Sequence, residues 1–143
     1  MNNKEFINSW FDCKVNNRKV KRHVYGHLCA DDEAVYSYGR HFPLATLCEN
    51  GFLLNGDRYS STTSCHQSLT RSACMEACEN SNLKFAVIPF TVLNNAGLMP
   101  VRKVEIIDET EEQYRDVEYI DKGGKRRIRQ EHLLGGSVIN FSN

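Results

Sequence analysis

Hydroxyl, basic and aromatic side chains cluster between residues 57 and 68, where the sequence reads DRYSSTTSCHQS. The simplest interpretation is the start of a helix, because Ser64 and Gln67 have the spacing of a capping box. In that motif the Ser hydroxyl accepts from the backbone N–H of the third helical residue, and the Gln side chain reaches back to the Ser N–H. Thr62 and Thr63 would then satisfy other free N–H groups of the first turn.

The same cluster permits two functional interpretations. Arg58, Thr62, Thr63 and His66 could bind a phosphate group at the positive end of the helix. Alternatively, His66 could activate Thr62 or Thr63 as the nucleophile of a small hydrolase or nuclease, although no acid has a spacing that would orient the imidazole. Helix caps are common and catalytic triads need three partners in register. The sequence therefore favours a structural or binding role and predicts no catalytic residue.

Aromatic and basic residues also alternate in the segment 36–43, which reads YSYGRHFP. In a β-strand, alternate residues share one face of the sheet. An aromatic and arginine face could stack a nucleobase, whereas the simpler alternative is packing within the sheet, with Gly39 relieving a bulge. A nucleotide or nucleic-acid site would join this face to the helix start. The predicted ligand-binding residues are Tyr36, Tyr38, Arg40, Arg58, Thr62, Thr63 and His66.

Neither the histidines nor the cysteines predict a metal or redox site. His23, His27 and His41 could converge on one sheet, but no acidic ligand is in register with them. The six cysteines contain no Cys-x-x-Cys pair. Free cysteines are usually buried, so we expect reduced, buried or half-buried thiols and neither a metal nor a cofactor.

Charge is segregated along residues 101–129, where an acidic stretch is followed by a basic one. The sequence DKGGK at 121–125 predicts a hairpin turn that would place the acidic and basic strands opposite each other. Such an arm is either a solvated hairpin with matched charge or a docking element for a partner or a second copy of this chain. Basic side chains there would also permit contact with a phosphate backbone. The predicted partner-binding residues are Glu111, Glu112, Arg126, Arg127 and Arg129.

These groups need helices and a sheet to position them. Aromatic and aliphatic residues at helical spacing predict a short N-terminal helix that begins near Asn2, which precedes Glu5 by three residues. Short extended segments with hairpin-type turns predict an antiparallel meander from about residue 23 to 59.

A four-residue period predicts the main helix at 63–79, and an apolar run predicts a strand at 84–93. The residues expected on the packed face of the main helix are Cys65, Leu69, Ala73 and Ala77. The predicted fold is therefore α+β, with a mostly antiparallel sheet packed by one main helix and a short N-terminal helix. The tail 130–143 has no predicted placement.

Length, composition and charge restrict the class of protein. The chain has 143 residues, 41% of them hydrophobic, with 18 basic and 18 acidic side chains. These values fit one soluble domain over residues 1–143, and the balanced charge supplies no general attraction to nucleic acid or membranes. The N-terminus is too polar for a signal peptide and no apolar run is long enough to span a membrane. We therefore expect a cytoplasmic protein.

Two of these motifs resemble a signature of small uncharacterised proteins encoded by phages and other mobile elements. Residues 36–45, YSYGRHFPLA, resemble the strand motif YSYGxHFPLA, and residues 59–67, YSSTTSCHQ, resemble the helix-start motif YSxTTxxHQ. The resemblance covers residues 35–71, about a quarter of the chain. It implies a mobile-element context and carries no catalytic role to any residue.

The leading hypothesis is a phage or mobile-element binding protein, such as an anti-defence inhibitor that binds a host protein or defence complex in stoichiometric amounts. The first alternative is a nucleotide or nucleic-acid binding module with its phosphate site at the N-terminus of the main helix. The second is a small hydrolase or nuclease that uses His66.

Overall fold

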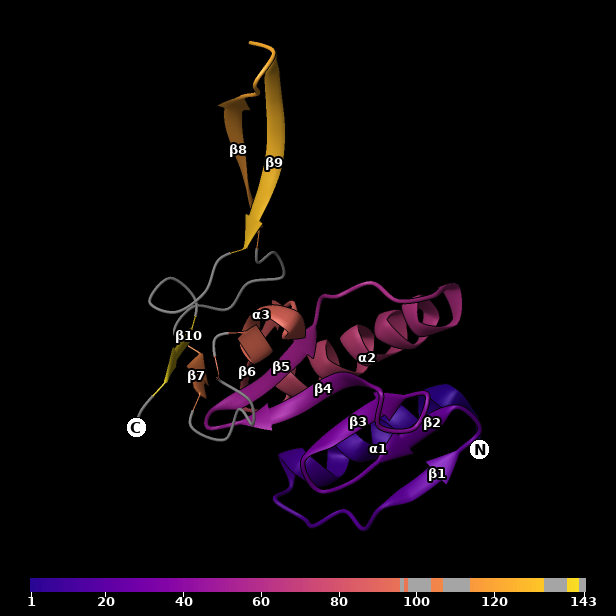
Figure 1. The fold of residues 1–143 in the computed structure, drawn as a ribbon. Helices are drawn as coiled ribbons and strands as arrows, with labels where there is room; N and C mark the ends of the chain where they lie inside the picture. The colour runs from indigo at the N-terminus through magenta and orange to yellow at the C-terminus, as the bar shows by residue number, and fades with distance from the viewer. Residues whose placement is uncertain (96, 98–103, 107–113, 133–138, 142–143) are drawn as a thin grey trace.

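The computed structural model describes residues 1–95, 97, 104–106, 114–132 and 139–141 (Figure 1). For residues 92, 114–118, 128–132 and 139–141 the description is limited to the backbone. The helices are α1 (Asn3–Val15), α2 (Ser61–Glu79) and α3 (Phe90–Asn95). The strands are β1 (His23–Tyr25), β2 (Leu28–Ala30), β3 (Ala34–Ser37), β4 (Phe42–Cys48), β5 (Gly51–Asn55), β6 (Lys84–Ile88), β7 (Val104–Ile106), β8 (Tyr114–Ile120), β9 (Arg126–His132) and β10 (Ile139–Phe141).

A six-stranded sheet in the order β1-β2-β3-β4-β5-β6 forms the framework of the protein. Strands β1 to β5 are antiparallel neighbours in sequence order, which confirms the predicted meander. Strand β6 instead lies parallel to β5, because α2 crosses over between them. Parallel neighbours require such a crossover, whereas hairpins suffice for antiparallel ones. The predicted α+β class with a mostly antiparallel sheet is confirmed.

Helix α1 begins as its sequence predicts. The Asn2 side chain accepts a hydrogen bond from the backbone N–H of Glu5 at 2.8 Å and caps the first turn. The side chains Phe6, Ile7, Trp10 and Phe11 are buried. They join residues of α2 and of strands β2 to β5 in one hydrophobic cluster, so that both helices pack on the same face of the sheet.

The opposite face of the sheet carries a second hydrophobic cluster. Sheet residues such as Leu53 and Ile88 pack there against α3 and β7. Strand β7 is attached to the sheet by Asn50, whose side chain bonds both the N–H and the C=O of Ile106 at 2.8 Å. Strand β5 lies between the two clusters and is buried at every residue, which explains the apolar run of Phe52, Leu53 and Leu54.

The strand predicted at 84–93 is correct only in its first half. Strand β6 ends at Ile88, Pro89 follows, and the chain turns into α3 at Phe90. Proline has no N–H to donate to a sheet, and the N–H of Phe90 is taken by the side chain of Asn55 at 3.2 Å. The apolar run therefore supplies a strand and then a helix.

Strands β8 and β9 form an antiparallel hairpin, here called the arm, that stands away from the rest of the protein (Figure 1). Its turn is organised by Asp121, whose side chain accepts from the N–H groups of Gly123 at 2.9 Å and Lys125 at 3.0 Å. The hairpin comprises residues 114–132. The strand Val104–Ile106, within the range predicted for the arm, pairs with β10. Among the described residues, no helix is both long enough and apolar enough to pass through a lipid bilayer.

Candidate functional site

The hydroxyl cluster starts helix α2, but one turn earlier than its sequence spacing suggests. Ser60 is the N-cap residue, and its Oγ accepts from the N–H of Thr63 at 3.1 Å. The predicted cap Ser64 lies inside the helix. Gln67 does not close a capping box, because its Nε2 donates to the carbonyls of Asn55 and Asp57 at 2.9 and 2.6 Å. The Gln side chain thus fastens the loop that precedes α2.

The buried face of α2 is polar in its first half. Thr63, His66 and Thr70 are buried, and the Nδ1 of His66 is 2.8 Å from the Oγ of Ser37 on β3. The same Ser37 Oγ lies 3.3 Å from Thr63 Oγ1, and Thr70 donates to the carbonyl of His66 at 2.7 Å. Cys65 is exposed, so its predicted place on the packed face is wrong, whereas Ala73 and Ala77 are buried as expected.

Ser37 and His66 form a serine–histidine pair that the sequence did not reveal. Burial lowers the pKa of His66, and the nearby charge of His27 lowers it further. The ring is therefore neutral at pH 7 and Nδ1 can accept the Ser37 hydroxyl proton. Among the described residues no carboxylate bonds to His66, and both side chains are enclosed. This geometry favours a structural pair over an activated nucleophile.

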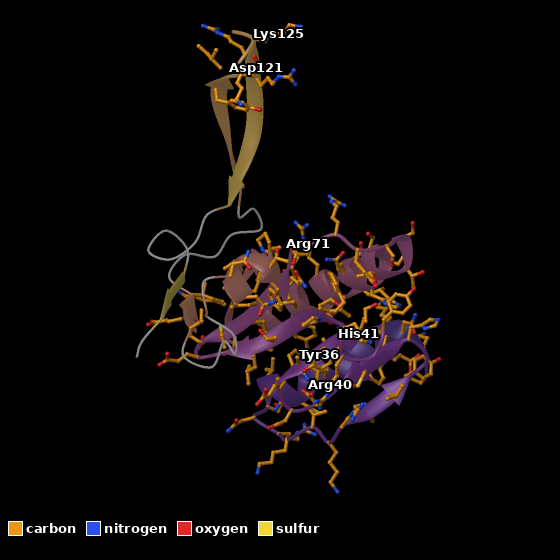
Figure 2. All side chains as sticks on the ribbon, in the orientation of Figure 1. Tyr36, Arg40, His41, Arg71, Asp121 and Lys125 are labelled. Carbon is orange, nitrogen blue, oxygen red and sulfur yellow. The ribbon has the colours of Figure 1, made fainter. Side chains whose placement is uncertain are left out.

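Tyr36 and Arg40 both bind Asp31 instead of presenting a free face. The Tyr36 hydroxyl donates to Asp31 Oδ2 at 3.2 Å, and Arg40 Nη2 lies 3.1 Å from the same oxygen. Tyr36 and Arg40 are labelled in Figure 2. Burial raises the pKa of Tyr36 to about 12, and the Asp31 charge adds to the effect. The Asp31 carboxylate also accepts from the N–H groups of Glu33 and Ala34, so the three side chains together fix a turn.

Tyr38 does not share a strand face with Tyr36, which corrects the predicted stacking surface. Strand β3 ends at Ser37, and Tyr38 follows with a left-handed backbone at φ 58°. Its N–H donates to the carbonyl of His27 at 2.7 Å. An aromatic residue rarely adopts this conformation, and here it turns the ring away from the line of the strand.

Four rings meet beside the start of α2, and we call them the ring cluster: His27, Tyr38, Phe42 and Tyr59. The Tyr38 centroid is 5.1 Å from that of His27 and 6.3 Å from that of Tyr59. Phe42 stacks on Tyr59 with centroids 5.7 Å apart and planes 17° from parallel. Three of these residues were absent from the predicted site, because the contacts join segments that are distant in sequence.

The predicted ligand-binding residues therefore fall into four groups. Tyr36 and Arg40 belong to the Asp31 turn, and Tyr38 belongs to the ring cluster. Thr63 and His66 are buried in the interface between α2 and the sheet. Arg58 and Thr62 remain exposed, on either side of the Ser60 cap and next to Tyr59.

The predicted partner-binding residues of the arm are only partly within the described residues. Arg126 and Arg127 are exposed near the turn, and Arg127 forms an ion pair with Asp121 that lowers the pKa of the Asp121 carboxyl. Only the backbone of Arg129 is described, and Glu111 and Glu112 lie outside the described residues. Figure 2 shows Asp121 and Lys125 at the end of the arm.

Histidine, cysteine and acidic side chains do not gather in threes around any point of the described structure in a way that could hold a metal ion. Cys29, Cys48 and Cys74 are buried and Cys13 and Cys78 are partly buried, as expected for apolar thiols. Burial raises the pKa of Cys48 to about 11. Cys65 alone among the six is exposed, contrary to the prediction.

Comparison of the chain with protein-family models, curated proteins and solved structures gives no significant match. The resemblance of residues 36–45 and 59–67 to phage and mobile-element proteins stays a prediction. The function is therefore inferred from the geometry of the arm and of the surface around α2.

Proposed function

We propose that this protein is a stoichiometric binding protein and that the arm is the element with which it docks on a partner. The observation that supports this proposal is the exposure of the arm together with the side chains at its end. Ile120 is 70% exposed, and Tyr119 and the basic residues of the turn are exposed beside it. Apolar side chains that are exposed next to each other and surrounded by charge are typical of a binding surface.

The arm is an ordered hairpin whose stability a bound partner would increase. Seven residues of each strand are paired, from Tyr114 opposite His132 to Ile120 opposite Arg126. At about 3.4 Å per residue the strands extend roughly 24 Å. A hairpin of two strands is only marginally stable in water, so a partner that covers it would stabilise it, and an ordered arm loses less entropy on binding than a disordered one.

Charge at the end of the arm favours an acidic partner surface. Residues 119–127 contain four basic side chains, Lys122, Lys125, Arg126 and Arg127, against Asp121, which gives a net charge of +3 in a chain of net charge zero. Complementary charge speeds association and disfavours wrong partners. On the resemblance to mobile-element proteins, we propose that the partner is a host protein or complex that acts in defence.

An affinity-capture experiment tests this proposal. The baits are the wild-type chain, a tip variant with Ile120→Ser, Lys122→Glu and Lys125→Glu, and a control with Lys19→Glu and Lys21→Glu, which alters exposed basic residues on the body. We expect host proteins that are captured by the wild type and the control and lost from the tip variant. Capture that is unaffected by the tip substitutions would contradict docking through the arm.

The stoichiometry needs a separate measurement on the purified components. Size-exclusion chromatography with light scattering should give a defined complex of the captured partner with the wild-type chain. The same measurement on the protein alone tests self-association through the arm, which the tip variant should abolish if it occurs. Turnover of a substrate without any stable complex would refute a stoichiometric binding protein.

A further inference from the structure

We infer that the ring cluster and the start of α2 together bind a nucleobase that carries a 5′-phosphate. In this arrangement Tyr59 stacks on the base and Arg58 contacts the phosphate. The inference is independent of the arm, because none of its residues lies in β8 or β9.

Tyr59 has the properties of a stacking platform. Its side chain is 65% exposed, yet it is held by the stacked ring of Phe42 and by the edge contact with Tyr38. Phe42 is itself buried and pairs with Ser37 in the sheet, so the support beneath Tyr59 is rigid. Single-stranded nucleic acids and nucleotides bind proteins through such exposed aromatic faces, since every base has a π-face.

The loop that carries Tyr59 is also fixed in place. The N–H of Gly56 donates to the carbonyl of Ile88 at 3.1 Å, and the N–H of Asp57 donates to the side chain of Asn55 at 2.9 Å. Gln67 binds the carbonyl of Asp57 from the other side. Because the loop is ordered before a ligand arrives, little conformational entropy is lost on binding.

Tyr38 supports the same conclusion through its backbone. A left-handed conformation is costly for an aromatic residue, and residues held in such a conformation concentrate at binding sites. Gly39 follows with φ 65°, a conformation that is open to glycine. The two positive φ values place the Tyr38 ring between those of His27 and Tyr59, where it borders one side of the platform.

The start of α2 supplies the anion site beside this platform. The N–H groups of Ser61 and Thr62 have no intrahelical partner, as at any helix start, and the first turn contains no acidic residue. Arg58 adds an exposed positive charge. The nearest acid in sequence, Asp57, is engaged elsewhere, because its carboxylate accepts from the N–H and hydroxyl of Thr91 at 3.0 Å each. A phosphate next to a base on Tyr59 would therefore meet donors and positive charge.

Binding is measured with four probes: thymidine 5′-monophosphate, thymidine, inorganic phosphate and a fluorescent 12-mer of deoxythymidine. Fluorescence anisotropy follows the oligonucleotide, and calorimetry follows the others. We expect the monophosphate or the oligonucleotide to bind, and thymidine and phosphate alone to bind more weakly. Binding of the 12-mer alone identifies single-stranded nucleic acid as the source of the base, and binding of the monophosphate as well identifies free nucleotides. Absence of binding by both overturns the inference.

Variants of the platform give the sharper result. Stacking on an aromatic side chain contributes about 1–3 kcal/mol per base, so Tyr59→Ala should weaken binding by about 5-fold to about 150-fold. Tyr59→Phe keeps the ring and should bind like the wild type, as should Tyr119→Ala, which removes an exposed tyrosine from the arm. Loss of binding in Tyr119→Ala with none in Tyr59→Ala would overturn the site and assign the nucleic acid to the arm.

Tyr38→Gly and Arg58→Ala test the two sides of the site separately. Glycine accepts the left-handed backbone without strain, which opposes the loss of the ring contacts with His27 and Tyr59, so Tyr38→Gly should still fold while it weakens binding. Arg58→Ala should weaken binding of the phosphate-bearing probes and leave that of thymidine unchanged, and Arg18→Ala, at another exposed arginine, should do neither. Equal loss for thymidine and its monophosphate in Arg58→Ala would contradict the assigned phosphate contact.

Discussion

The hydrogen bond between Ser37 and His66 can be used to test whether this pair is structural. Ser37→Ala removes the hydroxyl and leaves the Nδ1 of His66 without its partner at 2.8 Å. The side chains are 0% and 3% exposed, so bulk water does not replace the lost bond. An unpaired buried polar group costs about 1–3 kcal/mol. We expect the free energy of unfolding to fall by about 2 kcal/mol, which in a chain of this size lowers the melting temperature by about 7 °C.

A double-mutant cycle separates the hydrogen bond from other effects of the substitutions. His66→Leu replaces the imidazole by an apolar side chain, and the double variant removes both partners. The double variant removes both partners, so neither is left buried without the other. Its loss in free energy of unfolding should therefore be smaller than the sum of the two single losses by about 1 kcal/mol or more. Urea denaturation at pH 7.5 measures all four proteins. Additivity within about 0.5 kcal/mol would refute the proposed bond.

The pH dependence of stability gives an independent check of the same residue. Burial lowers the pKa of His66 in the folded protein below its ordinary value of 6.5, so the unfolded chain binds this proton more tightly. The stabilisation that comes from the lowered pKa of His66 is therefore complete above about pH 6.5. It is lost as the pH falls below this value, by at most about 1.4 kcal/mol per pH unit. In His66→Leu this component is absent, and stability should decline less below pH 6.5 than in the wild type. Parallel curves would show that His66 does not titrate as inferred.

Three further substitutions test the packing that positions the site, each by denaturant unfolding. Asn55→Ala leaves the carbonyl of Pro43 and a buried N–H without the side chain that binds them, and should cost about 2–5 kcal/mol; a cost below 1 kcal/mol would contradict the role of Asn55. Gly51→Ala would place a Cβ 1.8 Å from the carbonyl oxygen of Lys84, so we expect a loss above about 3 kcal/mol or failure to fold, and a wild-type stability would contradict this close approach. Thr46→Val removes a buried hydroxyl that has no hydrogen-bond partner among the described residues, and should stabilise the protein by about 1 kcal/mol, whereas a loss of stability would reveal a partner.

Elements specified by local sequence could be predicted closely. The spacing of Phe6, Ile7, Trp10 and Phe11 identifies helix α1, because a period near 3.6 places these residues on one side. The β4–β5 hairpin is indicated by the Asn50-Gly51 pair between two apolar segments, although the turn itself is Glu49-Asn50 and Gly51 is already paired in β5. In each case the information lies within a few residues of the element that it specifies.

Predictions failed where a contact distant in sequence decides between two local solutions. Ser60 and Ser64 are both suitable caps for α2, and the loop carbonyls that bind Gln67 select the earlier start. The apolar run after Lys84 could form a strand or a helix by its local sequence. Where the helix begins, the N–H of Phe90 donates to the side chain of Asn55. Such choices depend on tertiary contacts that overrule local preference.

The surface around α2 was harder to predict than the fold. Ser37 reads as a small polar residue between two tyrosines, and only the docking of α2 on the sheet brings it to His66. Tyr59 and Phe42 lie at the ends of different elements, and the packing of α2 on the sheet brings them together. A site assembled from three segments cannot be recognised by the spacing within any one of them.

The parallel pairing of β5 and β6 has a consequence for synthesis of the protein on the ribosome. When β5 leaves the exit tunnel, its neighbour β4 is already available, but the strand that covers its other edge is made only after the whole of α2. During that interval the nascent chain carries an apolar strand with one row of unpaired N–H and C=O groups, an arrangement that invites pairing with other chains. Chains truncated before Lys84 keep this edge open, and chains that extend through Ile88 have it covered.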